Sequence, residues 1–129
     1  MLSFGCSQPR RILIVDDNAV NRLVATKMVE KLGYDYDVVS DGAKAVEAAA
    51  RTAYSLILMD LNMPEMDGFQ ATGEIRRQES GGLRTPVIAC TAASVTVDRE
   101  WLEKSGLDDL LLKPFDLNQL SVVLSKWLA

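Results

Sequence analysis

The residues best able to do chemistry in this sequence stand directly after short apolar runs. Asp60 ends the run at 56–59, and Asp16 and Asp17 follow the run at 11–15. Runs this short, bounded by polar residues, are typical of strands buried on both faces of a sheet. Each carboxylate is therefore expected where a strand emerges, which in open α/β sheets is the edge that binds ligands.

Two more polar side chains, Thr91 and Lys113, end later apolar runs. Parallel strands would bring all these ends to one edge, together with the three acids. Two carboxylates about 5 Å apart repel by roughly 3 kcal/mol at an effective dielectric of about 20, so three converging acids favour a retained proton or a bound cation. The sequence has no histidine, and its cysteines lack metal-ligand spacing, so hard oxygen ligands favour magnesium or a similar ion.

The strands and helices that must position these groups are predicted from the spacing of apolar residues and from the turn and capping residues between them. Apolar runs predict strands at 11–15, 36–39, 56–60, 86–91 and 109–112. Helical spacing and propensity predict helices at 19–32, 43–53, 68–78, 94–105 and from 117 to the end of the chain. Strands that alternate with helices through short links predict an α/β doubly wound fold, with a parallel sheet covered by helices on both faces.

Particular residues support the helix boundaries. Asp17 or Asn18 can cap the first helix, and Gly33 can end it. The helix at 94–105 opens with weak helix formers and is expected to be the most mobile. In the first helix, five apolar residues fall near helical spacing: Val20, Leu23, Val24, Met28 and Leu32.

Length and composition limit the class of protein. With 129 residues, 48% of them hydrophobic, the chain fits one domain at 10–129, preceded by a flexible tail or linker remnant at 1–9. No apolar run reaches the roughly 18 residues of a membrane span, and the start of the chain lacks the regions of a signal peptide. Cys6 and Cys90 make no disulfide framework. We therefore expect a cytoplasmic protein in a reducing compartment.

Charge and the missing histidine exclude further classes. The net charge of −4, without a basic patch, argues against direct binding to nucleic acid. The absence of histidine excludes histidine-based catalytic triads, histidine-ligated zinc and a role as phosphohistidine donor. The chemistry must therefore use aspartate, threonine and lysine.

Taken together, these motifs resemble the receiver domain of two-component response regulators, from Arg10 to Leu128. The resemblance is carried by Asp16-Asp17, the segment 59–68 (MDLNMPEMDG), Thr91-Ala92 and Lys113-Pro114. The segments 17–22 (DNAVNR) and 66–72 (MDGFQAT) are most similar to receivers attached to hybrid histidine kinases.

The resemblance implies a flavodoxin-like strand order 2-1-3-4-5 and a role for each site residue. Asp60 would accept a phosphoryl group from a histidine kinase or a histidine phosphotransfer protein and later lose it by autodephosphorylation. Asp17, Asp60 and the backbone carbonyl of Asn62 would hold Mg²⁺, with Asp16 acting mainly through water. Thr91 and Lys113 would face the phosphoryl oxygens. The family also implies a monomer or weak dimer.

The family further implies a switch region at Thr91, Ala92 and Leu110 and a cis peptide bond before Pro114. Many receivers carry an aromatic residue where this chain has Leu110, so the family's aromatic switch is in doubt here. The loop after Thr91 and the helix at 94–105 would then transmit only a small conformational change.

Three other classes compete with this interpretation. A haloacid dehalogenase-type phosphohydrolase would need a second acid where Asn62 stands and would need room for a cap domain. A flavodoxin-like electron carrier would need a hydroxyl- and glycine-rich phosphate loop after the first strand, where this chain has acids. A pseudo-receiver that only binds partners is opposed by the complete set of acids, threonine and lysine, but it stays open.

Overall fold

The computed structural model describes residues 10–61, 63, 66–79, 84–92 and 99–128. In that part of the chain, strands alternate with helices: β1 (Arg11–Val15), α1 (Ala19–Lys31), β2 (Asp35–Val39), α2 (Gly42–Arg51), β3 (Leu56–Asp60), α3 (Gly68–Gln78), β4 (Val87–Ala92), α4 (Arg99–Lys104), β5 (Asp109–Lys113) and α5 (Leu117–Leu128). All strand pairs are parallel, in the order β2-β1-β3-β4-β5. The predicted doubly wound fold and strand order are confirmed.

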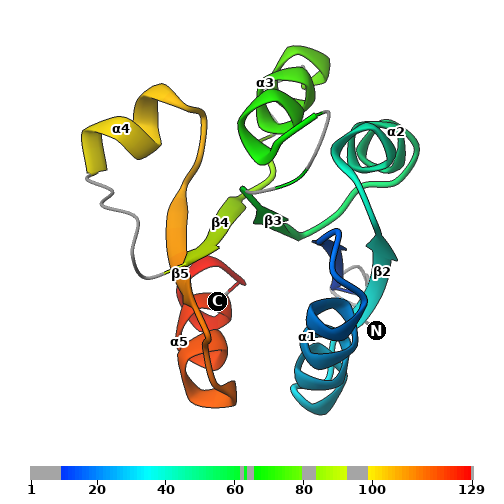
Figure 1. Ribbon diagram of the computed structural model, residues 1–129, viewed down its shortest axis with the longest axis vertical. Helices are drawn as coiled ribbons and strands as arrows, with labels where there is room; N and C mark the ends of the chain where they lie inside the picture. Colours follow the sequence, from blue (N-terminus) through cyan, green and yellow to red (C-terminus); the bar gives the residue numbers. More distant parts are fainter. Residues whose placement is uncertain (1–9, 62, 64–65, 80–83, 93–98, 129) are drawn as a thin grey trace, which may run out of the picture.

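The sheet lies between two helical layers, with α1 and α5 on one face and α2, α3 and α4 on the other (Figure 1). Alternate strand residues supply two apolar cores. Leu13, Ile57 and Ala89 belong to the core under α2, α3 and α4, whereas Ile14 and Leu58 belong to the core under α1 and α5. Because β3 is central and covered on both faces, all five of its residues are buried.

The register aligns the ends of the strands. Val15 pairs with Met59 across β1 and β3, and Asp60 pairs with Cys90 across β3 and β4. Lys113 in β5 pairs with Ala92, the last residue of β4. The polar residues that follow or end these strands therefore come to one edge of the sheet, as the sequence predicted.

Side-chain caps fix where the helices begin. Asn18, and not Asp17, caps α1 by accepting a hydrogen bond from the amide of Asn21, and Asp67 caps α3 in the same way. Gly33 follows the last turn of α1 with a φ of 90°, a conformation that favours glycine. The predicted boundaries hold within two residues except at α4, where 94–98 lie outside the described residues.

Helix α1 turns part of its apolar stripe outward. Val20, Leu23 and Val24 are 67%, 59% and 45% exposed, whereas Ala25 and Val29 are buried against the sheet. Helical spacing therefore predicted this helix correctly but did not identify its inward face. Among the described residues, no helix is long and apolar enough to cross a membrane.

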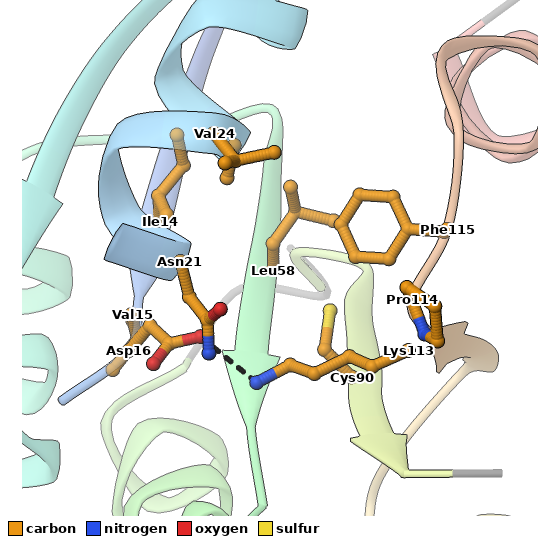
Figure 2. Close-up of a pocket in the computed structure, with 11 residues that line it drawn as sticks. Ile14, Val15, Asp16, Asn21, Val24, Leu58, Cys90, Lys113, Pro114 and Phe115 are labelled. Atoms are coloured by element: carbon orange, nitrogen blue, oxygen red, sulfur yellow. Dashed lines mark hydrogen bonds and ion pairs between the residues drawn. The ribbon is translucent and has the colours of Figure 1, made fainter. Parts of the chain in front are cut away.

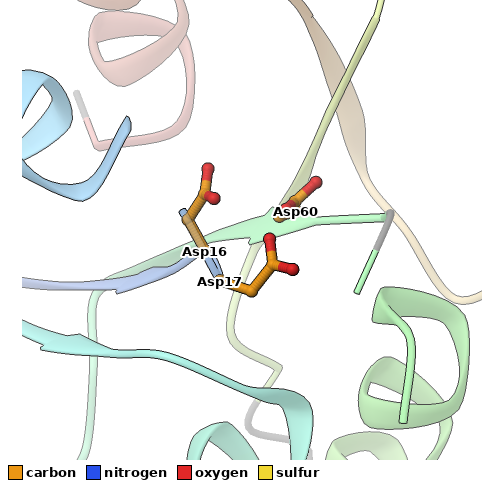
Figure 3. A group of neighbouring side chains, drawn as sticks. All are labelled: Asp16, Asp17 and Asp60. Carbon is orange, nitrogen blue, oxygen red and sulfur yellow. The ribbon is translucent and has the colours of Figure 1, made fainter. Parts of the chain in front are cut away.

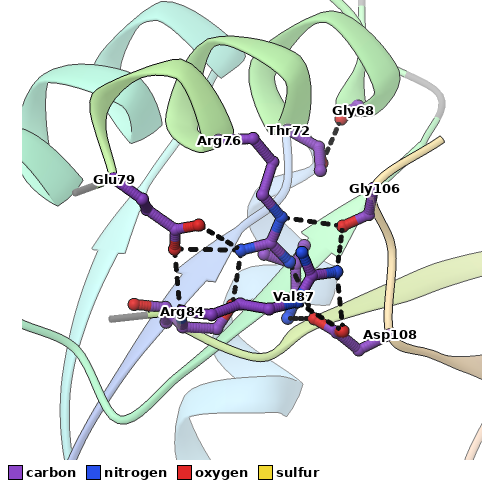
Figure 4. A network of polar contacts seen from close by, with 9 residues as sticks. Gly68, Thr72, Arg76, Glu79, Arg84, Val87, Gly106 and Asp108 are labelled. Atoms are coloured by element: carbon purple, nitrogen blue, oxygen red, sulfur yellow. Dashed lines mark hydrogen bonds and ion pairs between the residues drawn. The ribbon is translucent and has the colours of Figure 1, made fainter. Parts of the chain in front are cut away.

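The opposite edge of the sheet carries an ionic network centred on Arg76 of α3 (Figure 4). Its guanidinium donates to both carboxylate oxygens of Glu79, to Asp108 at 2.7 Å and to the carbonyls of Thr85 and Gly106. Asp108 also accepts from the amide of Val87 and from Arg84. The network joins the end of α3 to the starts of β4 and β5.

Candidate functional site

Three carboxylates meet at the carboxyl edge of the sheet (Figure 3). Asp16 and Asp17 follow β1, Asp60 ends β3, and one oxygen of each lies within 4.8 Å of the others. Asp16 and Asp60 are buried at 6% and 4% exposure, whereas Asp17 is exposed. The site therefore has two acids in its floor and one at its mouth.

Asp16 is held from several sides. Its Oδ1 accepts a 2.9 Å hydrogen bond from the amide of Asn18, and its Oδ2 accepts one of 2.9 Å from Nζ of Lys113. Its backbone carbonyl accepts a third, also 2.9 Å, from Nη1 of Arg22. Both carboxylate oxygens of Asp16 thus have protein donors.

Lys113 reaches the site from the end of β5. Its Nζ lies 2.9 Å from Oδ2 of Asp16 and 3.3 Å from Oδ1 of Asp60. Burial by itself lowers the pKa of Lys113, but the hydrogen bond to Asp16 and the charges of Asp60 and Asp16 outweigh it and raise this pKa above the ordinary value. Lys113 is therefore a cation at neutral pH.

Two glycines allow close backbone contacts next to the site. A Cβ on Gly68, at the start of α3, would lie 2.5 Å from the carbonyl oxygen of Asp60. A Cβ on Gly42, at the start of α2, would lie 2.5 Å from the carbonyl oxygen of Met66. Any other residue would force the backbone apart at either position.

The remaining predicted site residues are placed as follows. Thr91 is buried near the end of β4, Ala92 ends that strand, and Leu110 packs half-buried against the core under α2, α3 and α4. The Lys113–Pro114 peptide bond is cis. Asn62, the predicted carbonyl ligand, lies outside the described residues.

A pocket of about 460 Å³ opens beside the acids, between α1 and the chain after β5 (Figure 2). Asp16 and Lys113 stand at its polar end, whereas Val24, Leu58 and Phe115 give it apolar walls. Cys90 also lines the pocket, and burial raises the pKa of its thiol to about 12. The thiol stays protonated at neutral pH and is a poor nucleophile.

The donor set fits a hard divalent cation. Asp16, Asp17 and Asp60 bring three carboxyl groups together, and the ammonium of Lys113 lies against two of them. All three candidate ligand atoms are carboxylate oxygens, the donor type that magnesium and calcium prefer and that softer metals do not require. A cation at this point would relieve the repulsion between the acids.

Sequence reasoning missed some residues that build the site. Arg22 contacts the turn that carries Asp16 and Asp17, and Gly42 allows the close approach of the Met66 backbone. Arg22 lies four residues after the cap Asn18, in the first turn of α1, and this spacing was a signal in the sequence. Gly42 directly follows a capping aspartate, and its close contact depends on a segment more than twenty residues away.

Comparison with known proteins places this fold and site in a class. Residues 12–125 match the model of the response regulator receiver domain. The chain is 40% identical over 123 residues to the sensor protein GacS of Pseudomonas syringae pv. syringae, covering 94% of this chain and 14% of that protein. It therefore spans only a small part of the length of the curated relatives it matches.

Two solved structures extend the comparison. The receiver domain of a sensor histidine kinase from Pseudomonas aeruginosa PAO1, with a magnesium ion coordinated in its active-site cleft, is 44% identical with a TM-score of 0.83, covering 93% of this chain and 98% of that one. The receiver domain of the Saccharomyces cerevisiae response regulator Ssk1, crystallised with the histidine phosphotransfer protein Ypd1, is 27% identical with a TM-score of 0.81, covering 92% and 88%.

The protein is thus a flavodoxin-like α/β domain with an acidic pocket at the carboxyl ends of its strands. More particularly, the chain belongs to the response regulator receiver domain family, and it is similar to receivers of hybrid sensor histidine kinases. The resemblance read from the sequence is confirmed.

Proposed function

We propose that Asp60 accepts a phosphoryl group from a phosphohistidine on a partner protein, as one step of a phosphorelay. The observation that carries this proposal is the position of Asp60. It is buried at the end of the central strand, within 4.8 Å of two other acids and 3.3 Å from the Lys113 ammonium. A carboxylate so placed is fixed as a nucleophile, with positive charge beside the group it would attack.

The three acids would hold Mg²⁺, directly or through water, with the backbone carbonyl of Asn62. When bound, the cation supplies charge neutralisation for the acids and for the phosphoryl oxygens. In the transfer, an oxygen of Asp60 forms a bond to phosphorus as the phosphorus–nitrogen bond of the donor breaks, and the imidazole leaves with its electron pair. Lys113 and Thr91 would face the equatorial oxygens. Water later attacks phosphorus, which releases phosphate and restores the carboxylate.

The outward face of α1 is the surface that we assign to the phosphodonor. Val20, Leu23 and Val24 are exposed large apolar residues on the helix that starts beside the acids. Lys27 and Lys31 continue the same face one and two turns further along, because residues three and four apart share a side of a helix. The partner proposed is a histidine phosphotransfer protein, the class crystallised with the similar receiver of Ssk1.

Mass spectrometry tests the acceptor. Incubation with acetyl phosphate and Mg²⁺ should add one labile phosphate to the wild type and none to Asp60→Asn. A full signal in that variant would sink the assignment of Asp60.

Transfer kinetics test the partner surface. Leu23→Glu should slow transfer from a phosphorylated histidine phosphotransfer protein on the order of tenfold, the effect of losing a central apolar contact, and leave labelling by acetyl phosphate unchanged. Val122→Glu changes an equally exposed apolar residue on α5 and serves as the matched control. Equal slowing in both variants would place the donor elsewhere.

The wider setting follows from the same relatives. We propose that the domain works on the cytoplasmic side of a histidine kinase system, as a monomer or weak dimer and without direct contact to nucleic acid. Leu110 lacks the aromatic ring through which many receivers report their state. Its presence supports a role as an intermediate carrier of the phosphoryl group.

A further inference from the structure

Arg22 is the only arginine of α1, and it reaches back over the turn that carries the first two acids. Its Nη1 donates a 2.9 Å hydrogen bond to the backbone carbonyl of Asp16, six residues earlier in the chain. Its own amide donates a hydrogen bond to the carbonyl of Asn18, which anchors Arg22 in the first turn of the helix. The side chain thus ties the helix to the strand end.

The other contacts of this turn leave one peptide plane for Arg22 to fix. The backbone amide of Asn18 donates to the Asp16 carboxylate, and the side chain of Asn18 caps α1. The amide of Asp16 is bound by the carbonyl of Val39 in β2 at 3.3 Å. The carbonyl that Arg22 engages belongs to the peptide joining Asp16 to Asp17, the exposed acid of the cluster.

We infer that Arg22 is a positioning residue of the acidic pocket, which holds the Asp16–Asp17 peptide so that the Asp17 carboxylate faces Asp60. Repulsion from the two buried acids favours an outward position of Asp17, because it is exposed and sits on a turn. Fixing this peptide plane opposes that movement. Arg22 does not compete with a cation for the Asp17 carboxylate, because it binds a backbone carbonyl. This inference rests on the proposed magnesium site and names a residue on which that site depends.

A simpler role for Arg22, as a nearby positive charge, predicts the opposite sign. Removing a cation close to the acids would strengthen magnesium binding by Coulomb attraction. Removing a positioning contact would weaken it, because groups that orient metal ligands typically account for roughly 10- to 100-fold in metal affinity. The direction of the change therefore separates the two roles.

Arg22→Met tests this, because methionine keeps an unbranched stem and loses both the donor and the charge. Calorimetric titration with Mg²⁺ should give a Kd roughly tenfold higher than that of the wild type. Arg22→Lys, which keeps one donor and the charge, should fall between the two and also serves if Arg22→Met does not fold. Arg51→Met, which removes an exposed arginine paired with Glu47 on α2, should leave the Kd unchanged.

Labelling by acetyl phosphate supplies a second readout that a merely structural role would not move. In Arg22→Met the Mg²⁺ concentration for half-maximal labelling should rise with the Kd, while the rate at saturating Mg²⁺ stays close to that of the wild type. A Kd equal to or below the wild-type value, or a rate deficit that persists at saturation, overturns the inference. Failure of the wild type to bind Mg²⁺ or to be labelled at Asp60 would instead overturn the proposed function.

Discussion

The two edges of the sheet each gather charged residues, but they balance them differently. At the amino edge, Arg76 and Arg84 meet Glu79 and Asp108, so the charges cancel and each side chain has several protein partners (Figure 4). At the carboxyl edge, three aspartates converge (Figure 3). Lys113 pairs with two of them, Asp16 and Asp60. A cluster whose charges cancel can hold structural elements together, whereas an excess of acids favours a bound cation.

A second polar cluster links the middle of β2 to the start of β1 and to the residue pair before β3. Asp37 in β2 accepts a 2.9 Å hydrogen bond from Arg11 and a 2.6 Å hydrogen bond from the hydroxyl of Tyr54. Burial, followed by the hydrogen bond and the negative charge of Asp37, raises the pKa of Tyr54 to about 12. These side chains therefore hold neighbouring strands together.

The largest expected effect is on stability and comes from Arg76 at the amino edge. Arg76→Met should lower the free energy of unfolding by roughly 3–5 kcal/mol, because it removes the arginine partner of the largely buried Glu79 and one of the two arginine partners of the largely buried Asp108. Arg77→Met, one residue further along α3, changes a 71% exposed arginine paired with Glu74 on the surface and should cost about 0–1 kcal/mol. Urea denaturation measures both, and equal losses would contradict the contrast between the edges.

Magnesium bound at the carboxyl edge should stabilise the wild type. A ligand that binds only the folded state contributes about 2.7 kcal/mol at a concentration roughly a hundredfold above its Kd. Asp17→Ala should abolish this magnesium-dependent gain and leave the metal-free protein folded and at least as stable, because it removes one of three repelling charges. Thermal melts with and without Mg²⁺ measure the gain. An unchanged gain in Asp17→Ala would mean that the ion binds elsewhere.

The free energy of unfolding should also depend on alkaline pH through Tyr54. The raised pKa of Tyr54 contributes stability that is fully present below the ordinary tyrosine pKa of 10 and is lost as the pH rises toward about 12. Tyr54→Phe should therefore show a smaller loss of unfolding free energy over that interval than the wild type. Tyr34→Phe removes a different tyrosine hydroxyl and is the control. Parallel curves for wild type and Tyr54→Phe would remove Tyr54 from the account.

The smallest expected effect is at Thr91. Thr91→Ala should change the Kd for Mg²⁺ by less than about twofold, since threonine is not among the three candidate acid ligands. The same variant should lose the amide shifts that beryllofluoride induces in α4 of the wild type, because the hydroxyl would contact the phosphoryl group and not the cation. Wild-type NMR spectra in which α4 stays unmoved would favour a carrier that changes little in shape.

The sequence alone determined the fold and the location of the site. Short apolar runs alternating with helical segments require a parallel sheet, and a parallel sheet brings the residues after its strands to one edge. Asp16, Asp60 and Lys113 could therefore be placed together before any coordinate was known. The capping of α3 by Asp67 and the stop at Gly33 were equally local, because each depends on residues within one turn.

Tertiary structure decided which groups are paired and which faces are covered. Arg76 meets Asp108 across 32 residues, a separation at which no periodicity predicts a partner. The sequence placed Lys113 and Asp16 at the same edge, but the packing decided that Nζ of Lys113 binds Oδ2 of Asp16. The outward position of Leu23 likewise depends on how α1 rolls against the sheet, where Ala25 and Val29 allow the closer approach. Spacing fixes where along the chain a side chain occurs, whereas pairing and exposure depend on how elements distant in sequence pack together.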